Sequence, residues 1–283
     1  MSIVITGATG LLGRQVVADL LAAGVPAGEV TAVARSAEKA ADLGVRVHVG
    51  DYDRPETFAG AFAAGDRVLF VSGTELGKRV GQHTAVIDAA KAADVAQLVY
   101  TGVFGGPDAD FALADDHRAT EQRILDAGLP YTFLRNNWYS EVAVPDVAGS
   151  LARGAVVNSV LADARIATAP REDYAAAAAA AVHTDGHLGV AYELGGDTAW
   201  TFGEFAAELA RIRGSPVVHT TVPSAEYEAI VTGAGMPPFL ATFLVDVDDA
   251  ISRGRLAGTL GELAKLLGRP TTPIAETIAK LLG

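Results

Sequence analysis

The sequence predicts an α/β protein, with a Rossmann doubly wound parallel sheet and a smaller, mostly helical C-terminal lobe. Two observations support this class: apolar strand patterns alternate with helical spacing up to residue 135, and a glycine-rich turn directly follows the first strand pattern. Parallel strands need helical crossovers, so the alternation predicts helices on both faces of one sheet. We assign residues 1–135 to a nucleotide-binding Rossmann domain, to which elements from about 155–195 return. Residues 136–283 belong mainly to a substrate-side lobe.

The first unit, residues 2–13, predicts a strand, a tight turn and the start of a helix. Gly7 can adopt backbone angles closed to other residues, Gly10 lets a pyrophosphate approach its amide, and Gly13 lets the helix pack against the strand. The N–H groups at the helix start then attract phosphate. The alternative is a turn that binds nothing. We expect the dinucleotide to contact Gly7, Ala8, Thr9, Gly10, Leu11, Leu12 and Gly13.

The next pattern indicates which dinucleotide is preferred. Helical spacing from Leu12 ends at Gly24, and residues 30–34 form a second strand that ends at Arg35. NAD-preferring proteins usually carry an acidic residue at that strand end, where it binds the ribose 2′-hydroxyl. A guanidinium can instead bind a 2′-phosphate and stack on adenine. Arg35 therefore predicts NADP preference; the alternative is a solvated arginine at a strand end.

The third unit continues the alternation. Ser36 is expected to cap a helix that runs to Gly44, and a cap explains residues 36–39 better than a Ser-x-x-Lys nucleophile, because no partner motif is present. Alternating valines at 45–49 predict a third strand leading to Asp51 and Tyr52, where an adenine ring is expected. Pro55 then suits the first position of another helix.

The remaining elements of the first half follow in order. We expect strands at 68–71, 97–101 and 131–134 and helices at 80–93 and 115–127. In such folds, ligands bind at the carboxyl ends of the strands. The segments at the carboxyl ends of all six strands should therefore share one rim. Their residues are Gly7, Arg35, Asp51, Ser72, Gly73, Thr101 and Arg135.

The second half is less regular. Short strands are expected at 155–158, 166–168, 191–194 and 217–221, and an alanine-rich helix at 171–183. Thr-x-x-Glu patterns at 201–204 and 259–262 predict capping boxes, each opening an amphipathic helix.

Composition excludes several classes of function. The formal net charge is -12 and the pI about 4.9, which argues against nucleic acid or an anionic membrane surface as a partner. The absence of cysteine excludes disulfides, zinc–thiolate and iron–sulfur sites, and thiol catalysis. No signal-type segment opens the chain, and the longest apolar run, 175–182, is too short to span a bilayer. We therefore expect a cytoplasmic protein.

No metal site is expected. His183 and His187 are four residues apart, but we interpret them as loop residues because no further ligand pattern accompanies them. A Gly-x-Ser-x-Gly pattern is also missing from the sequence, which argues against a hydrolase.

Together these motifs resemble the NmrA-like, atypical short-chain dehydrogenase/reductases, and within them the bacterial type-2 NAD(P)H:quinone oxidoreductases. The resemblance rests on residues 7–13, Arg35, Tyr100-Thr101 and 134–141, and it extends through 75–83, 171–175 and 268–272. Residues 100–102 and 131–136 also resemble the related triarylmethane-dye reductases. Gly102 stands where the quinone-reductase pattern has serine, which leaves the acceptor open.

The resemblance implies a nicotinamide site without the usual catalytic pair. No tyrosine is followed by lysine four residues later, and the corresponding segment places His117 and Glu121 where that pair would stand. Alcohol–carbonyl chemistry needs a proton delivered with the hydride. A quinone instead takes hydride to give a hydroquinone anion that water can protonate. We therefore expect direct hydride transfer from NADPH to a quinone, without flavin or metal.

Residues past the sixth strand are the candidates for the substrate side. Trp138 and Tyr139 could stack on a flat acceptor or close over the nicotinamide, or simply pack between lobes. Asn136 and Asn137 could bond a carboxamide or a quinone oxygen, or serve as turn residues. His117 could donate to a quinone oxygen, or be structural.

The proposed catalytic set is thus His117, Trp138 and Asn136. The resemblance adds Asn137, Tyr139, Ser140, Glu141 and Arg171 to the cofactor contacts. For Arg171 the alternative is a surface arginine at a helix start. Two other functions stay open, namely reduction of another flat, electron-poor acceptor such as a triarylmethane dye, and a non-enzymatic NADP-sensing regulator. We expect a small quinone-like substrate and allow for a homodimer.

Overall fold

The large sheet is built as the alternation predicts. The computed structural model describes residues 2–75, 77–144 and 146–282. Seven parallel strands lie in the order β3-β2-β1-β4-β5-β6-β8. Their bounds are β1 Ile3–Ile5, β2 Val30–Ala34, β3 Arg46–Val49, β4 Arg67–Phe70, β5 Gln97–Val103, β6 Tyr131–Asn136 and β8 Val190–Leu194. The strand order reverses direction between β1 and β4, and in such sheets the crevice at that reversal receives the ligand.

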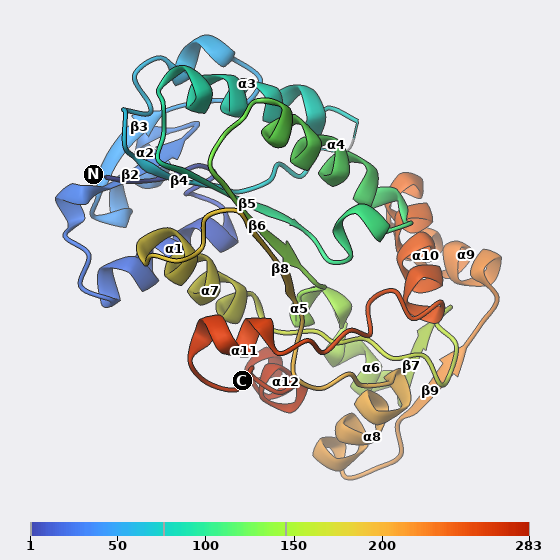
Figure 1. Cartoon of the computed structure of the whole chain (residues 1–283). Coiled ribbons are helices and arrows are strands. Elements are labelled where there is room, and N and C mark those ends of the chain that lie inside the picture. Colours follow the sequence, from blue (N-terminus) through green and yellow to red (C-terminus); the bar gives the residue numbers. More distant parts are fainter. Residues whose placement is uncertain (1, 76, 145, 283) are drawn as a thin grey trace.

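Helices cover both faces of the sheet (Figure 1). On one face α1 (Leu11–Ala22) packs on α7 (Arg171–His183), which also contacts α11 (Glu262–Leu267). On the other face α3 (Arg79–Ala92) packs on α4 (Ala112–Asp126), while the short α2 (Ala37–Ala40) lies beside β2 and β3. The alanine run of α7 is buried, and its small side chains let this helix lie close to α1 and the sheet.

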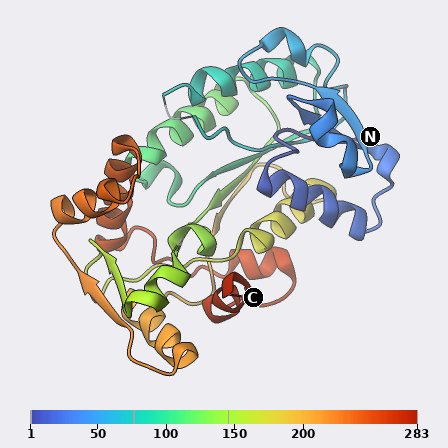
Figure 2. The same cartoon turned by 180° about the vertical axis from the view of Figure 1, so that it is seen from behind.

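The second lobe lies beside the large sheet (Figures 1 and 2), and it has its own core. Its strands β7 (Ala155–Asn158) and β9 (Val218–Thr221) pair with each other in parallel, apart from the large sheet. Trp138, Trp200 and Phe205 belong to its buried cluster, which also takes Phe104 from the segment after β5. The lobe's helices are α5 Ser140–Ala143, α6 Val147–Arg153, α8 Phe202–Arg213, α9 Ser224–Gly233, α10 Pro238–Ser252 and α12 Ile274–Leu282. The predicted fold class is thus confirmed.

One of the two predicted capping boxes is wrong. At α8, Thr201 Oγ1 accepts from the Glu204 N–H and the Glu204 carboxylate accepts from the Thr201 N–H, as predicted. At α11 the N-cap is Gly261, with φ +73°, and no side chain caps it. The Glu262 carboxylate instead accepts from the N–H of Glu193, 2.6 Å away, so a contact with β8 replaces the local one.

Three other predicted elements differ from the structure in type or length. Pro55 opens one 3-10 turn, Pro55–Phe58, rather than a helix. The predicted strand at 166–168 is a single bridge between Ile166 and Trp200. The helix expected to run to Gly44 divides into α2 and a 3-10 turn, Ala41–Leu43. None of the helices in the described ranges is long and apolar enough to cross a membrane.

Candidate functional site

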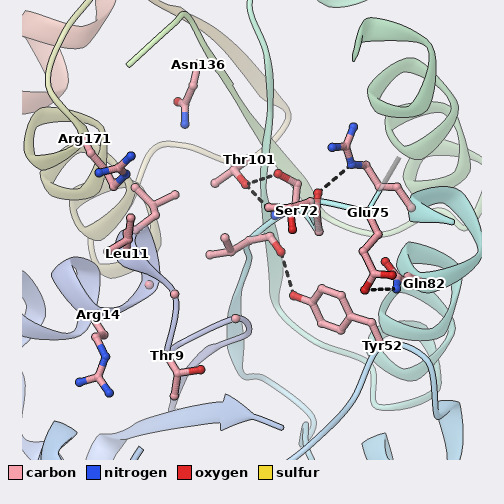
Figure 3. A pocket seen from close by; sticks show the side chains of 18 of the residues that line it. Thr9, Leu11, Arg14, Tyr52, Ser72, Glu75, Gln82, Thr101, Asn136 and Arg171 are labelled. Carbon is pink, nitrogen blue, oxygen red and sulfur yellow. Dashed lines mark hydrogen bonds between the residues drawn. The ribbon is translucent and has the colours of Figure 1, made fainter. Parts of the chain in front are cut away.

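A cavity of about 960 Å³ lies along the carboxyl ends of the parallel strands. Figure 3 looks into it, with Leu11 and Arg171 on one side and Tyr52, Glu75 and Gln82 on the other. The fold brings most of the predicted site residues into its lining. These are Gly7, Thr9, Gly10, Leu11, Leu12, Gly13, Arg35, Asp51, Tyr52, Ser72, Gly73, Thr101, His117, Asn136, Asn137, Trp138, Tyr139 and Arg171.

The glycine turn forms one end of this cavity. Gly7 has φ +61°, and its carbonyl accepts from the Gly10 N–H at 2.9 Å. A Cβ on Gly13 would lie 2.5 Å from the same carbonyl, so α1 packs on the turn too closely for any side chain there. Within the described residues no side chain caps the start of α1, so its first N–H groups are left for an anion. This cradle fits the pyrophosphate of a dinucleotide.

Three cations surround the end of β2. Arg35 is exposed and lines the cavity, as do Arg14 and Lys39, which the sequence analysis missed. Arg14 pairs with Asp42 at 2.7 Å, which fixes its side chain beside α2. Arg14 directly follows the glycine turn, but nothing local in the sequence showed that α1 and α2 would meet beside Arg35. Three positive groups suit the phosphate that distinguishes NADP from NAD.

The middle of the cavity has a rigid polar floor. The Tyr52 hydroxyl lies 2.6 Å from Thr6 Oγ1 and 2.8 Å from the Val71 carbonyl, and burial raises the pKa of this phenol, so it stays neutral. Thr101 Oγ1 accepts from the Ser72 N–H at 2.9 Å. These bonds join the ends of β1, β4 and β5, so the floor is preorganised before any ligand binds.

The loop after β4 is held through both sides of Gly73. His83 Nε2 accepts from the Gly73 N–H at 2.9 Å, and the Arg79 Nε donates to the Gly73 carbonyl at 2.7 Å. The acceptor role of Nε2 places the ring proton on Nδ1, which donates to Thr120 Oγ1 at 2.8 Å. Burial first, and then the proximity of His117 and Arg79, lowers the pKa of His83 to about 2. In the sequence, residues 75–83 contribute to the family resemblance, but no local pattern indicates a role for Arg79 or His83.

His117 is buried beside a tyrosine. Its Nδ1 lies 2.7 Å from the Tyr100 hydroxyl, and burial raises the pKa of that phenol, which therefore keeps its proton. We assign the phenol as the donor of this bond and Nδ1 as its acceptor. Burial first and the charge of Arg79 second lower the pKa of His117 to about 3. The neutral ring then carries its proton on Nε2, which makes no hydrogen bond to the described residues. His117 thus offers the cavity a neutral N–H donor.

The segment after β6 forms the opposite wall. Asn136 Oδ1 is buried without a hydrogen-bond partner in the described chain, whereas Asn137 donates through Nδ2 to the Leu256 carbonyl at 3.0 Å. The Trp138 ring packs against Phe243 of α10, with centroids 6.1 Å apart. The Arg171 guanidinium lies 5.1 Å above the Tyr139 ring. Asn137 therefore connects this wall to the second lobe, whereas Asn136 has a carbonyl oxygen that can still accept a hydrogen bond.

Three predicted residues lie outside the cavity lining. Ala8 is fully buried beneath the turn, where its N–H donates to the Val33 carbonyl. Ser140 Oγ donates to Thr168 Oγ1 at 2.8 Å, and the Glu141 carboxylate accepts from the Arg171 N–H at 3.2 Å. These residues support the segments around the cavity and do not line it.

The described ranges contain no group of three or more His, Asp or Glu side chains placed to hold a metal ion. His183 ends α7, and His187 lies in the following loop, 2.8 Å from both Thr184 Oγ1 and the Tyr192 hydroxyl.

Comparison with known proteins gives a consistent result. Residues 7–185 match the family described as NAD(P)H-binding. Quinone oxidoreductase 2 of Escherichia coli is 39% identical over 99% of this chain and 98% of its own length. The crystal structure of that NADPH-dependent enzyme with NADPH has a TM-score of 0.95, covering 99% of this chain and 100% of that one.

A dye reductase is nearly as similar. The Citrobacter triphenylmethane reductase complexed with NADP(H) is 37% identical, with a TM-score of 0.94 and 99% of each chain covered. The resemblance inferred from the motifs is thereby confirmed. The chain belongs to the NAD(P)H-binding family, and it is similar over nearly its full length to a quinone oxidoreductase and to a triphenylmethane reductase.

Proposed function

We propose that this protein is an NADPH-dependent oxidoreductase that transfers hydride directly to a quinone. One observation carries the proposal: a single cavity joins the glycine turn and the Arg35 cations to the wall formed by Asn136 and Trp138. One end suits a phosphorylated dinucleotide, and the other suits a flat ring. The likeness to Escherichia coli quinone oxidoreductase 2 supports the same acceptor.

The chain's own residues divide the work of binding. The free N–H groups of α1 hold the pyrophosphate, and Arg35 with Arg14 and Lys39 holds the 2′-phosphate. Asn136 Oδ1, buried and unpaired in the described residues, accepts from the nicotinamide carboxamide. Bound in this way, NADPH supplies the hydride.

The acceptor side needs orientation more than acid catalysis. Trp138 and Phe243 present aromatic surface to a flat ring, and His117 offers a neutral donor to its oxygen. Glu121, at the position of the usual catalytic lysine, is 6% exposed and accepts two hydrogen bonds from Arg135. That ion pair occupies the carboxylate, so Glu121 does not replace the usual lysine in proton transfer.

Dye reduction is the second candidate, favoured by the Citrobacter likeness and by Gly102. A Cβ at Gly102 would lie 3.0 Å from Glu121 Oε1, so glycine leaves room beside the cavity that serine would fill. A sensor that binds NADP without turnover is the third. Following NADPH absorbance with a panel of quinones and cationic dyes tests all three: quinone turnover supports the proposal, dye turnover alone supports the second candidate, and binding without oxidation supports the sensor.

Two further parts of this proposal are a cytoplasmic location and a homodimer as the open alternative to a monomer. Cell fractionation tests the first, and light scattering of the purified protein tests the second.

Arg35→Asp should change cofactor preference. A carboxylate would face the 2′-phosphate, and losing one charge-assisted hydrogen bond costs roughly 1.5–3 kcal/mol before repulsion is added. We expect the dissociation constant of NADPH to rise at least about tenfold more than that of NADH. Isothermal titration with both cofactors measures this, and equal weakening of both would show that Arg35 does not contact the phosphate.

The rate of quinone reduction should depend little on pH around neutrality. His117 has a pKa lowered to about 3, so it is neutral and unable to act as a titrating acid between about pH 6 and 9. The measurement is kcat against pH with saturating NADPH. An inflection near the ordinary histidine pKa that disappears in His117→Gln would make His117 the proton donor.

A further inference from the structure

Arg79 is a buried cation in the cavity wall, and the binding of NADPH proposed above does not use its charge. It is the first residue of α3, is 4% exposed, and lines the same cavity as His117 and Asn136. The other cations of that lining in the described chain, Arg14, Arg35, Lys39 and Arg171, are exposed or half-buried. Arg79 therefore brings charge to the part of the cavity where water screens it least.

The guanidinium of Arg79 has unused hydrogen-bonding capacity. Its Nε donates to Gly73, but the buried Nη1 has no hydrogen-bond partner and lies 3.6 Å from Asp116 Oδ2. Its Nη2 makes no hydrogen bond to the described residues. The Asp116 side chain is 23% exposed, so water weakens the only carboxylate pairing of Arg79 in the described chain. A buried cation in this state is matched to an anion that enters the cavity.

The charge of Arg79 acts on His117, which lies where the acceptor would bind. It contributes, after burial, to the lowered pKa of His117, on the adjacent helix α4. The Nε2–H of His117 and the Nη2 of Arg79 thus supply two donors to one region of the cavity. Two converging donors, one of them charged, are the arrangement that stabilises an oxyanion.

We propose that Arg79, with His117, stabilises the oxygen on which negative charge develops in a quinone acceptor, and that Arg79 thereby favours quinones over cationic dyes. The inference rests on the proposed function. In the step, NADPH is oxidised to NADP⁺ while the quinone gains two electrons and one proton as hydride. The product is a hydroquinone monoanion, which takes a second proton from water.

The charge of the acceptor explains why one cation can favour quinones over triarylmethane dyes. Hydride changes a quinone from neutral to -1 and a triarylmethane dye cation from +1 to neutral, so Arg79 assists the chemical step in both. Binding differs, because the neutral quinone is indifferent to Arg79 while the dye cation is repelled by it. Removing the charge should therefore lower kcat for quinones and lower KM for dyes.

The test compares Arg79→Met and Arg79→Lys with Lys78→Met as matched control, since Lys78 is the neighbouring cation but is 66% exposed and outside the cavity lining. With p-benzoquinone, Arg79→Met should lose roughly 100-fold in kcat with little change in KM, as when one oxyanion donor is removed. With crystal violet, the same variant should show a KM lowered about tenfold or more. Arg79→Lys should restore part of the quinone rate, and the control should match wild type.

A binding measurement separates failure of this inference from failure of the proposed function. p-Nitrophenol is a ring whose coloured anion carries the charge of a hydroquinone monoanion. Its apparent pKa in the complex with protein and NADP⁺, read by absorbance, should be lower for wild type than for Arg79→Met by about one unit or more. This readout needs no turnover, so it holds even if quinones prove not to be substrates.

Three outcomes would overturn the inference. An unchanged p-nitrophenol pKa in Arg79→Met would show that the guanidinium does not face the ring. A rise in the NADPH dissociation constant that accounts for the whole kinetic loss would assign Arg79 to the cofactor. Arg79→Met could fail to fold while a folded Arg79→Gln shows normal quinone and dye kinetics. That result would mean that Arg79 only holds the Gly73 loop and has no role toward the acceptor.

Discussion

Gly10→Val is expected to raise the NADPH dissociation constant at least about 100-fold while the protein still folds. The branched side chain would stand over the first turn of α1, in the space that the pyrophosphate needs. Losing two hydrogen bonds to a charged group costs roughly 3 kcal/mol or more, which corresponds to this factor. Gly10 has φ -76° and ψ 166°, an extended conformation open to any residue. A Cβ there would lie 3.2 Å from the Gly7 carbonyl, a close contact that a small shift relieves, so folding should survive. Isothermal titration and thermal unfolding measure the two effects.

Neighbouring glycines provide controls for this prediction. Gly28 has no atom within 4 Å of a Cβ built on it, so Gly28→Val should leave NADPH affinity unchanged. Gly13→Ala should unfold the domain instead, because its Cβ would lie 2.5 Å from the Gly7 carbonyl and 2.8 Å from the Ala8 Cα. Near-normal NADPH affinity in a folded Gly10→Val protein would contradict the assignment of the cradle.

Arg135→Met should be among the most destabilising single substitutions in the chain. The guanidinium donates through Nε and Nη2 to Glu121, at 3.0 and 2.7 Å, and through Nη1 to Glu193 at 2.9 Å. Burial alone would lower the pKa of Arg135, but the two carboxylates raise it overall, so the cation is firmly held. Breaking a buried pair from one side typically costs about 3–5 kcal/mol. Urea unfolding at neutral pH measures the loss.

The matched control is Arg165→Met. Arg165 also makes a two-pronged contact with a carboxylate, Glu204, but both side chains are about half exposed. An exposed pair contributes about 1 kcal/mol or less, so this variant should unfold almost like wild type. Equal losses in the two variants would contradict a special role for burial at Arg135.

Several parts of the molecule were determined by the sequence itself. The strand at 30–34 and the helix at 171–183 were predicted at their observed bounds, and the turn at 7–13 has the predicted strand–turn–helix form. Each of these depends on local properties: an unbroken apolar run, an alanine-rich segment, or a glycine that must adopt a positive φ. The order of such elements then predicted the parallel sheet and the rim on which the candidate residues meet.

Tertiary structure decided what no local pattern encodes. Residues 259–262 carry the letters of a capping box, yet the Glu262 carboxylate binds the Glu193 N–H because β8 lies beside it. Glu121 meets Arg135 only because α4 packs over β6, and Arg79 becomes a buried cation only where α3 meets α4. Contacts between residues far apart in sequence depend on which surfaces pack together. The partners of these residues, and hence the charge and hydrogen bonding of the proposed acceptor site, could therefore be assigned only from the tertiary structure.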